Sequence, residues 1–125
     1  MGIIIPQGDD GIITRAKMPQ IAQGDIPELL SYLGSFDIGF KAGRINPKLV
    51  KAHQAIDLEK AMNIPRDVLS VPVILSNEPY VIDGDHRWYR LNVENLLMPY
   101  IMIEEDFNTA LKYIFSFPKT YESEK

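Results

Sequence analysis

The chain has 125 residues, 46% of them hydrophobic and 24% charged, which is the balance of one ordinary globular domain. Its formal net charge of −4 argues against binding of duplex DNA through total charge, although it does not exclude a local basic patch. The absence of cysteine excludes disulfides, thiolate metal sites and cysteine nucleophiles, and favours a reducing compartment such as the cytoplasm. No apolar run approaches the roughly 18 residues of a membrane span, and the N-terminus lacks a signal peptide's basic segment.

The first 45 residues are expected to form an arm that precedes the core. Ile3–Ile5 and Gly11–Thr14 are predicted short strands, and Lys17–Ile21 is predicted to be extended because Pro19 disfavours a helical conformation before it. Asp25 is a candidate N-cap for a helix with proline in its first turn, which should end between residues 34 and 39. The apolar face of this helix is predicted to consist of Ile26, Leu29, Leu30 and Leu33.

The second part of the chain begins with a predicted glycine-containing loop at Lys41–Asn46. A strand is expected at Pro47–His53, followed by a helix that Asp57 caps and that Asn63-Ile64-Pro65 ends. Val71–Leu75 and Tyr80–Ile82 are rich in β-branched residues and flank a turn sequence, which predicts a hairpin.

The remaining elements complete a compact α+β unit. A helix is expected over Asp85–Asn95, then a strand at Met98–Glu104 and a last helix capped by Asn108. The predicted organisation is therefore an N-terminal arm (1–45) with one amphipathic helix, a core with a mixed sheet (46–117) and a loose polar tail (118–125).

The stretch Tyr80–Leu91, YVIDGDHRWYRL, places charged residues where a buried strand meets a helix. Gly84 permits a sharp turn and a close approach of a ligand to the backbone. The following amides lie at a helix start, where unpaired N–H groups and the helix dipole favour an anion. Arg87 adds a fork of donors suited to phosphate, and His86 is an acid or base near neutral pH. This junction is therefore a candidate phosphate site.

Other interpretations of the same stretch remain open. Asp83 or Asp85 is also a suitable helix cap, in which case His86 and Arg87 are exposed first-turn residues with no ligand. The oxygens of Asp83 and Asp85 are also candidate ligands for Mg²⁺, although the spacing matches no known metal motif.

The stretch VPVILSNEPYVIDGDHRWYRL resembles the core motif of the ParB/sulfiredoxin superfamily, whose members carry a glycine-containing, arginine-ending turn at this place. Upstream, LVKAHQAIDLEKAM resembles the opening strand and helix of the same superfamily, with Gln54 at the position of a characteristic glutamine. The resemblance spans roughly residues 45–117. The arm at Lys17–Ile21 is similar to that of small phage-encoded ParB-like proteins.

The resemblance implies that the phosphates of ATP or CTP, with or without Mg²⁺, rest on Gly84, Asp85, His86, Arg87 and Gln54. It assigns catalytic roles to Asp85, His86 and Arg87 in a phosphohydrolase, a nuclease or a phosphotransferase such as a kinase. Position 85 is Asp where sulfiredoxins have cysteine, so sulfinic-acid repair is excluded. The residues after the core are also too few for the DNA-binding and dimerisation domains of a chromosome-partition ParB.

Two functions remain open at this point. The first is an enzyme of the class just described, acting mainly by positioning and charge stabilisation. The second is a non-catalytic module that senses a nucleotide or binds a host or phage protein, with the apolar helix of the arm as the contact surface.

Several further residues have both a functional and a structural interpretation. A basic stretch is a candidate DNA contact or a solvated loop: Lys41, Arg44, Lys48 and Lys51. Candidates for covering or contacting the pocket are Arg15, Lys17, Gln20 and His53. Trp88 is expected in the core rather than stacked on a base. The acidic run Glu104–Asp106 is expected to be a solvated strand end with a helix cap rather than a metal site.

Overall fold

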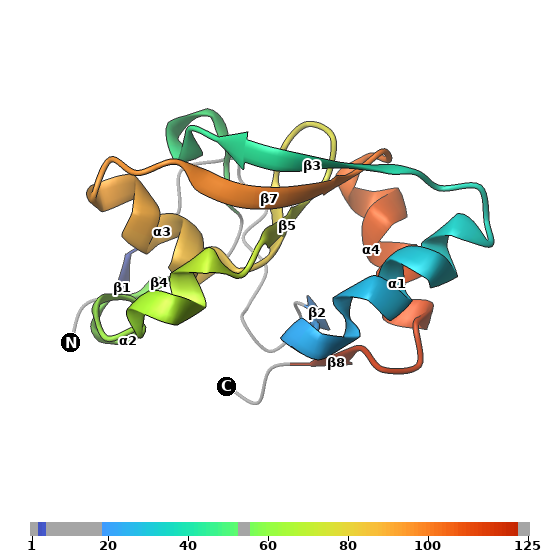
Figure 1. Ribbon diagram of the computed structural model, residues 1–125, viewed down its shortest axis with the longest axis horizontal. Helices are drawn as coiled ribbons and strands as arrows, with labels where there is room; N and C mark the ends of the chain where they lie inside the picture. The colour runs from blue at the N-terminus through green and yellow to red at the C-terminus, as the bar shows by residue number, and fades with distance from the viewer. Residues whose placement is uncertain (1–2, 5–18, 53–55, 123–125) are drawn as a thin grey trace.

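A computed structural model describes residues 3–4, 19–52 and 56–122 of the chain (Figure 1). Its central sheet has the strand order β3-β7-β5-β6. β3 (Phe40–Ile45) is antiparallel to β7 (Met98–Ile103), β7 is parallel to β5 (Val73–Leu75), and β5 is antiparallel to β6 (Val81–Asp83). The sheet is therefore mixed, and the predicted α+β class and the predicted hairpin are confirmed.

In the described part of the chain, four α-helices and several short elements surround this sheet. The helices are α1 (Ile26–Gly34), α2 (Leu58–Met62), α3 (Asp85–Val93) and α4 (Phe107–Ser116). The short strands pair as β1 (Ile3–Ile4) with β4 (Ile56–Asp57) and as β2 (Pro19–Gln20) with β8 (Tyr121–Glu122). The 3₁₀ turns are η2 (Gln23–Asp25), η3 (Pro47–Leu49) and η4 (Arg66–Ser70). Within the described ranges, no helix has the length and apolar character needed to cross a membrane.

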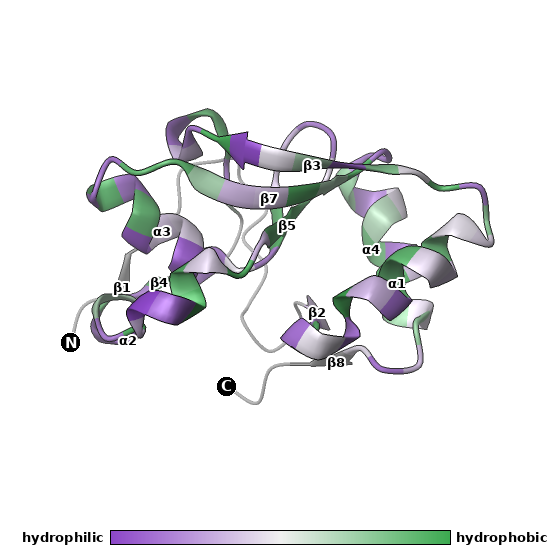
Figure 2. Ribbon diagram, in the orientation of Figure 1, coloured by the Kyte–Doolittle hydropathy of each residue, from purple (hydrophilic) through white to green (hydrophobic). Residues whose placement is uncertain are grey.

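The sheet separates two hydrophobic cores, and β7 contributes to both. Ile101 and Ile103 pack in the larger core with α1 and α4, whereas Met98, Tyr100 and Met102 belong to the smaller core with α3. This division follows from strand geometry, because successive side chains point to opposite faces. Figure 2 shows hydrophobic residues along β7 and β5, between the two groups of helices.

The helix caps differ in part from the prediction. Asp57 caps α2 as expected, because its side chain accepts the N–H of Lys60 at 3.3 Å. The cap predicted at Asn108 is wrong, since Asp106 caps α4 by accepting the N–H of Thr109 at 2.8 Å. Asn108 is the second residue of α4, whereas a capping side chain comes from the residue directly before the helix.

Two predictions between residues 41 and 53 are wrong. The predicted loop at Lys41–Asn46 is largely strand β3, whose backbone bonds to β7 although its side chains are mostly exposed. The predicted strand at Pro47–His53 begins instead with η3, because Pro47 suits a helical first turn and the Asn46 side chain accepts the N–H of Lys48 at 3.0 Å. Residues 53–55 lie outside the described part.

The predicted arm and tail pack on the core where the structure describes them. Leu29 and Leu33 of α1 are 0% and 1% exposed and belong to the larger core, so the expected protein-binding face of this helix is already covered. β3 is likewise a strand of the central sheet. The expectation of a loose tail is wrong through residue 122, because β8 pairs with β2 and Lys119 Nζ lies 2.8 Å from Glu28 Oε1. The strand predicted at Gly11–Thr14 lies outside the described residues.

Candidate functional site

The turn between β6 and α3 has a backbone conformation that requires glycine. Gly84 has φ 111° and ψ 29°, in the left-handed region. A Cβ at this position would lie 2.7 Å from Nη2 of Arg87 and 3.1 Å from Cγ2 of Val73. The guanidinium of Arg87 therefore lies directly against the backbone of the turn. The first helical hydrogen bond runs from the Trp88 N–H to the Gly84 carbonyl at 2.9 Å, so the amides of residues 85–87 precede it.

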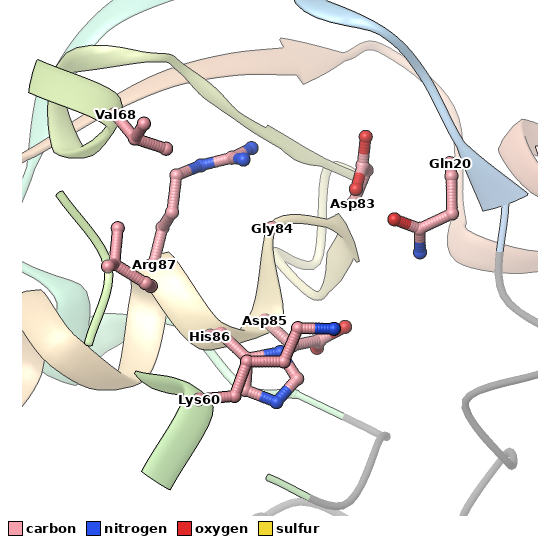
Figure 3. Close-up of a pocket in the computed structure, with 9 residues that line it drawn as sticks. Gln20, Lys60, Val68, Asp83, Gly84, Asp85, His86 and Arg87 are labelled. Carbon is pink, nitrogen blue, oxygen red and sulfur yellow. The ribbon is translucent and has the colours of Figure 1, made fainter. Parts of the chain in front are cut away.

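A pocket of about 170 Å³ opens at this turn. Its lining comes from α3 and the end of β6, from β2, from α2 and from the segment that follows α2. The lining residues are Gln20, Lys60, Ile64, Val68, Asp83, Gly84, Asp85, His86 and Arg87. In Figure 3, Arg87 and Asp83 lie on one side of Gly84, and Lys60, Asp85 and His86 gather on the other.

The structure brings two distant residues to the turn. Gln20, which the sequence suggested as part of a covering segment, does line the pocket. Lys60 was not identified from the sequence, because a lysine on a short helix carries no local signal that points to a site 24 residues later in the chain.

Arg87 is partly buried and has unused hydrogen-bonding capacity. Its Nη2 donates to the carbonyl of Pro72 at 3.2 Å, while its buried Nε has no hydrogen-bond partner among the residues that the structure describes. Burial lowers the pKa of Arg87, and the nearby carboxylates of Asp83 and Asp85 act in the opposite direction. An arginine keeps its charge under these conditions. The site therefore holds a cation whose donors the protein satisfies incompletely.

Asp83 and His86 each hold a backbone amide of a different segment. Oδ2 of Asp83 accepts the N–H of Ile21 at 3.0 Å, which ties the segment after β2 to the sheet. Nε2 of His86 accepts the N–H of Asp57 at 3.1 Å, which ties the start of α2 to α3. Since Nε2 is an acceptor, the proton of the neutral imidazole is on Nδ1.

These contacts correct two of the alternatives drawn from the sequence. Neither Asp83 nor Asp85 occupies the N-cap position of α3, because Gly84 is the N-cap residue. His86 is not an exposed first-turn residue, since it is 8% exposed.

In the described part of the chain, no group of three or more His, Asp or Glu side chains is arranged to hold a metal ion. Asp83 and Asp85 remain two neighbouring carboxylates in the pocket. A divalent cation held there would need further oxygens from a ligand or from water. In the acidic run Glu104–Asp106, Asp106 is a helix cap, as the structural interpretation predicted.

The other candidate residues either lie outside the described part of the chain or are described and absent from the lining of this pocket. Gln54, His53, Arg15 and Lys17 lie outside the described residues. Trp88 is buried, and its Nε1 donates to the carbonyl of Pro47 at 2.9 Å, which confirms the core interpretation.

The basic stretch lies elsewhere on the surface. Lys48 Nζ donates to the carbonyl and to Oδ1 of Asn92 at 3.0 and 2.9 Å, and with Lys51 it lines a separate pocket beside Trp88. Arg44 lines a third depression at the far end of β3. No residue of the stretch contributes to the lining of the pocket at Gly84.

Comparisons with protein-family models, with curated proteins and with solved structures found no match to this chain. Its function is therefore inferred from the motif and from the geometry of the site.

Proposed function

We propose that the turn from Asp83 to Arg87 binds a phosphate group of a nucleotide, ATP or CTP, together with Mg²⁺. One observation carries this proposal: Arg87 is partly buried, its Nε has no hydrogen-bond partner among the described residues, and its side chain lines a pocket at the N-terminus of α3. The resemblance of this motif to the ParB/sulfiredoxin superfamily supports the same ligand class.

The physical properties of the pocket suit a phosphate. The amides of residues 85–87 and the dipole of α3 favour negative charge at this position, and arginine binds phosphate oxygens with two parallel donors. A volume of about 170 Å³ has room for a phosphate and some water, given the ~30 Å³ that each water occupies in the liquid. The nucleoside would then lie outside this pocket.

The pocket contains charges of both signs, which favours binding of a phosphate together with a cation. Lys60 and Arg87 carry positive charge, and Asp83 and Asp85 carry negative charge. An anion alone would be attracted by Lys60 and Arg87 but repelled by the two carboxylates. Mg²⁺ bridging a carboxylate and phosphate oxygens removes this repulsion.

As an enzyme, the protein would be a phosphohydrolase, a nuclease or a phosphotransferase. Arg87 would stabilise charge on the transferred or attacked phosphate, and Asp85 would hold the cation or accept a proton. Nε2 of His86 accepts the Asp57 amide and is therefore not available for proton transfer while that bond is in place. Gln54 would contact the phosphates, as the resemblance implies.

A specific observation also favours the second function, nucleotide sensing without turnover. Asp83 and His86 bond to amides of two separate segments, the one after β2 and the start of α2. A ligand that changes either contact changes the position of a segment, which is the behaviour of a sensor.

The test is calorimetric titration of the full chain with ATP, CTP and GTP in the presence of Mg²⁺, with phosphate release measured in the same samples. We expect one nucleotide to bind, and Arg87→Ala to weaken it by about thirtyfold or more, because a charge-assisted hydrogen bond contributes about 2 kcal/mol. Arg66→Ala is the matched control, since the Arg66 side chain is 75% exposed and lies outside the pocket.

Phosphate release distinguishes the two functions. Binding with phosphate release supports the enzyme, and binding without release supports the sensor. If no nucleotide binds to the folded wild-type chain, or if Arg87→Ala binds as tightly as wild type, the proposal is wrong.

A further inference from the structure

β3 forms one edge of the central sheet, away from the pocket at Gly84. It is the terminal strand in the order β3-β7-β5-β6, and Figure 1 shows it at the outer border of the sheet beside β7. Among the described residues its only strand partner is β7, and the side chains from Phe40 to Arg44 are exposed. A six-residue strand of this kind presents backbone donors and acceptors for a further strand.

The register shows which of these backbone groups point outward. The Glu104 N–H donates to the Gly39 carbonyl at 3.0 Å, and this pair continues the register in which Phe40 faces Ile103. Since hydrogen-bonded and non-hydrogen-bonded pairs alternate in an antiparallel ladder, the odd-numbered residues of β3 bond to β7. The N–H and C=O groups of Phe40, Ala42 and Arg44 therefore point away from the sheet.

We propose that β3 pairs antiparallel with β3 of a second copy of this chain, with Ala42 on the two-fold axis. In this register Ala42 faces Ala42, and Phe40 of each copy faces Arg44 of the other. All of these residues have outward backbone groups, so each facing pair exchanges both of its N–H···O=C bonds. The two four-stranded sheets become one continuous sheet.

The side chains of β3 are complementary to each other in this register. Phe40 is 46% exposed, and Arg44 has no ion-pair partner in the described part of the chain. Placing the Arg44 guanidinium beside the Phe40 ring of the other copy gives each of them a cation–π partner. On the other face of the strand, Lys41 faces Gly43. Charged residues normally protect an exposed edge, but here no two cations face each other.

The pairing also covers an open apolar groove. Arg44 lines a depression of about 570 Å³ together with Leu96, Leu97 and Pro99, and Leu97 is 61% exposed. Because Phe40 of the second copy faces Arg44, its ring lies at the rim of this groove. Two-fold symmetry repeats this contact at the other end of the strand pair.

Sedimentation velocity of the full chain over a range of concentrations tests the proposal. We expect a dimer, and expect Ala42→Pro to raise its dissociation constant by about thirtyfold, because proline removes the outward N–H on the axis in both copies. Proline at this position costs no bond to β7, so the thermal unfolding midpoint should change little. Ala42→Ser, which keeps the N–H, is the matched control and should dimerise as wild type does.

A cysteine cross-link tests the register. Residues of a facing hydrogen-bonded pair have Cα atoms about 5.5 Å apart, within the range that a disulfide spans. Ala42→Cys should therefore form a covalent dimer on mild oxidation, whereas Lys112→Cys, exposed on α4, should not. A wild-type chain that stays monomeric, a dimer that Ala42→Pro leaves intact, or the absence of a cross-link at position 42 overturns the proposal.

Discussion

Arg87 and Arg90 lie three residues apart on α3 and have opposite surroundings. Nη1 of Arg90 lies within hydrogen-bond distance of three carbonyls, and its Nε donates to Glu94. The three acceptors and their distances are Ala61 at 3.3 Å, Met62 at 3.2 Å and Ile64 at 3.3 Å. Arg87 has one such bond, to Pro72.

The difference separates a structural arginine, Arg90, from the arginine that we propose binds phosphate, Arg87. Arg90 supplies donors for the carbonyls at the end of α2, which a helix of five residues leaves without intrahelical partners. Arg87 is partly buried, and its Nε has no hydrogen-bond partner among the described residues, which costs desolvation free energy. The proposed phosphate site depends on this difference in hydrogen bonding.

The largest expected effect comes from Arg90→Met. Because it leaves three carbonyls and Glu94 without this donor, we expect the free energy of unfolding to fall by about 3 kcal/mol. Urea denaturation followed by circular dichroism measures this loss, with Arg66→Met at an exposed position as the control. A loss below about 1 kcal/mol would remove the contrast between the two arginines.

Gly84→Ala should come second, with a loss of about 2 kcal/mol, since a residue with a Cβ is strained at φ 111° and crowds Arg87 and Val73. The same denaturation experiment measures it. Gly34→Ala is the control, because no atom lies within 4 Å of a Cβ placed there. Equal stability of the two variants would show that the turn at Gly84 relaxes without cost.

Arg87→Met should change the free energy of unfolding by less than about 1 kcal/mol, because relief of the desolvation cost offsets the lost attraction to Asp83 and Asp85. Nucleotide binding should be lost in the same variant. A stability loss as large as that of Arg90→Met would assign Arg87 a structural role.

The smallest effect is expected at the cap of α4. Hydrogen bonds from Thr109 lower the pKa of Asp106. A lowered folded-state pKa means that the ionised cap stabilises the fold above the unfolded-state pKa of about 3.9, and that this stability is lost as the pH falls through the folded-state value. The unfolding midpoint of wild type should therefore exceed that of Asp106→Ala at neutral pH, with the difference shrinking below about pH 4.

Asp106→Asn separates the charge of this cap from its hydrogen bond. Asparagine also caps helices but does not titrate. The unfolding midpoint of Asp106→Asn should therefore exceed that of Asp106→Ala by the same amount at acid and neutral pH. If this difference shrinks at acid pH as it does for wild type, groups other than Asp106 cause the pH dependence.

Local signals in the sequence predicted the hairpin, the turn at Gly84 and helix α3. These depend on residues close together in the chain: the β-branched runs of β5 and β6, a glycine at a strand end and the charged residues after it. The same locality explains why β3 was missed. Its residues are exposed and lack an alternating pattern, so only the bonds to β7, more than fifty residues later in the chain, make it a strand.

Local patterns in the chain are thus sufficient to predict the α+β class and a candidate phosphate turn at Gly84 to Arg87. The folded structure adds that Lys60 lines the same pocket as that turn, that His86 holds the start of α2, and that α1 belongs to the core. It also decided which backbone groups of β3 point outward. The physical reason is that turns and caps depend on neighbouring residues, whereas strand register and pocket lining depend on contacts between distant segments, which a single sequence does not encode locally.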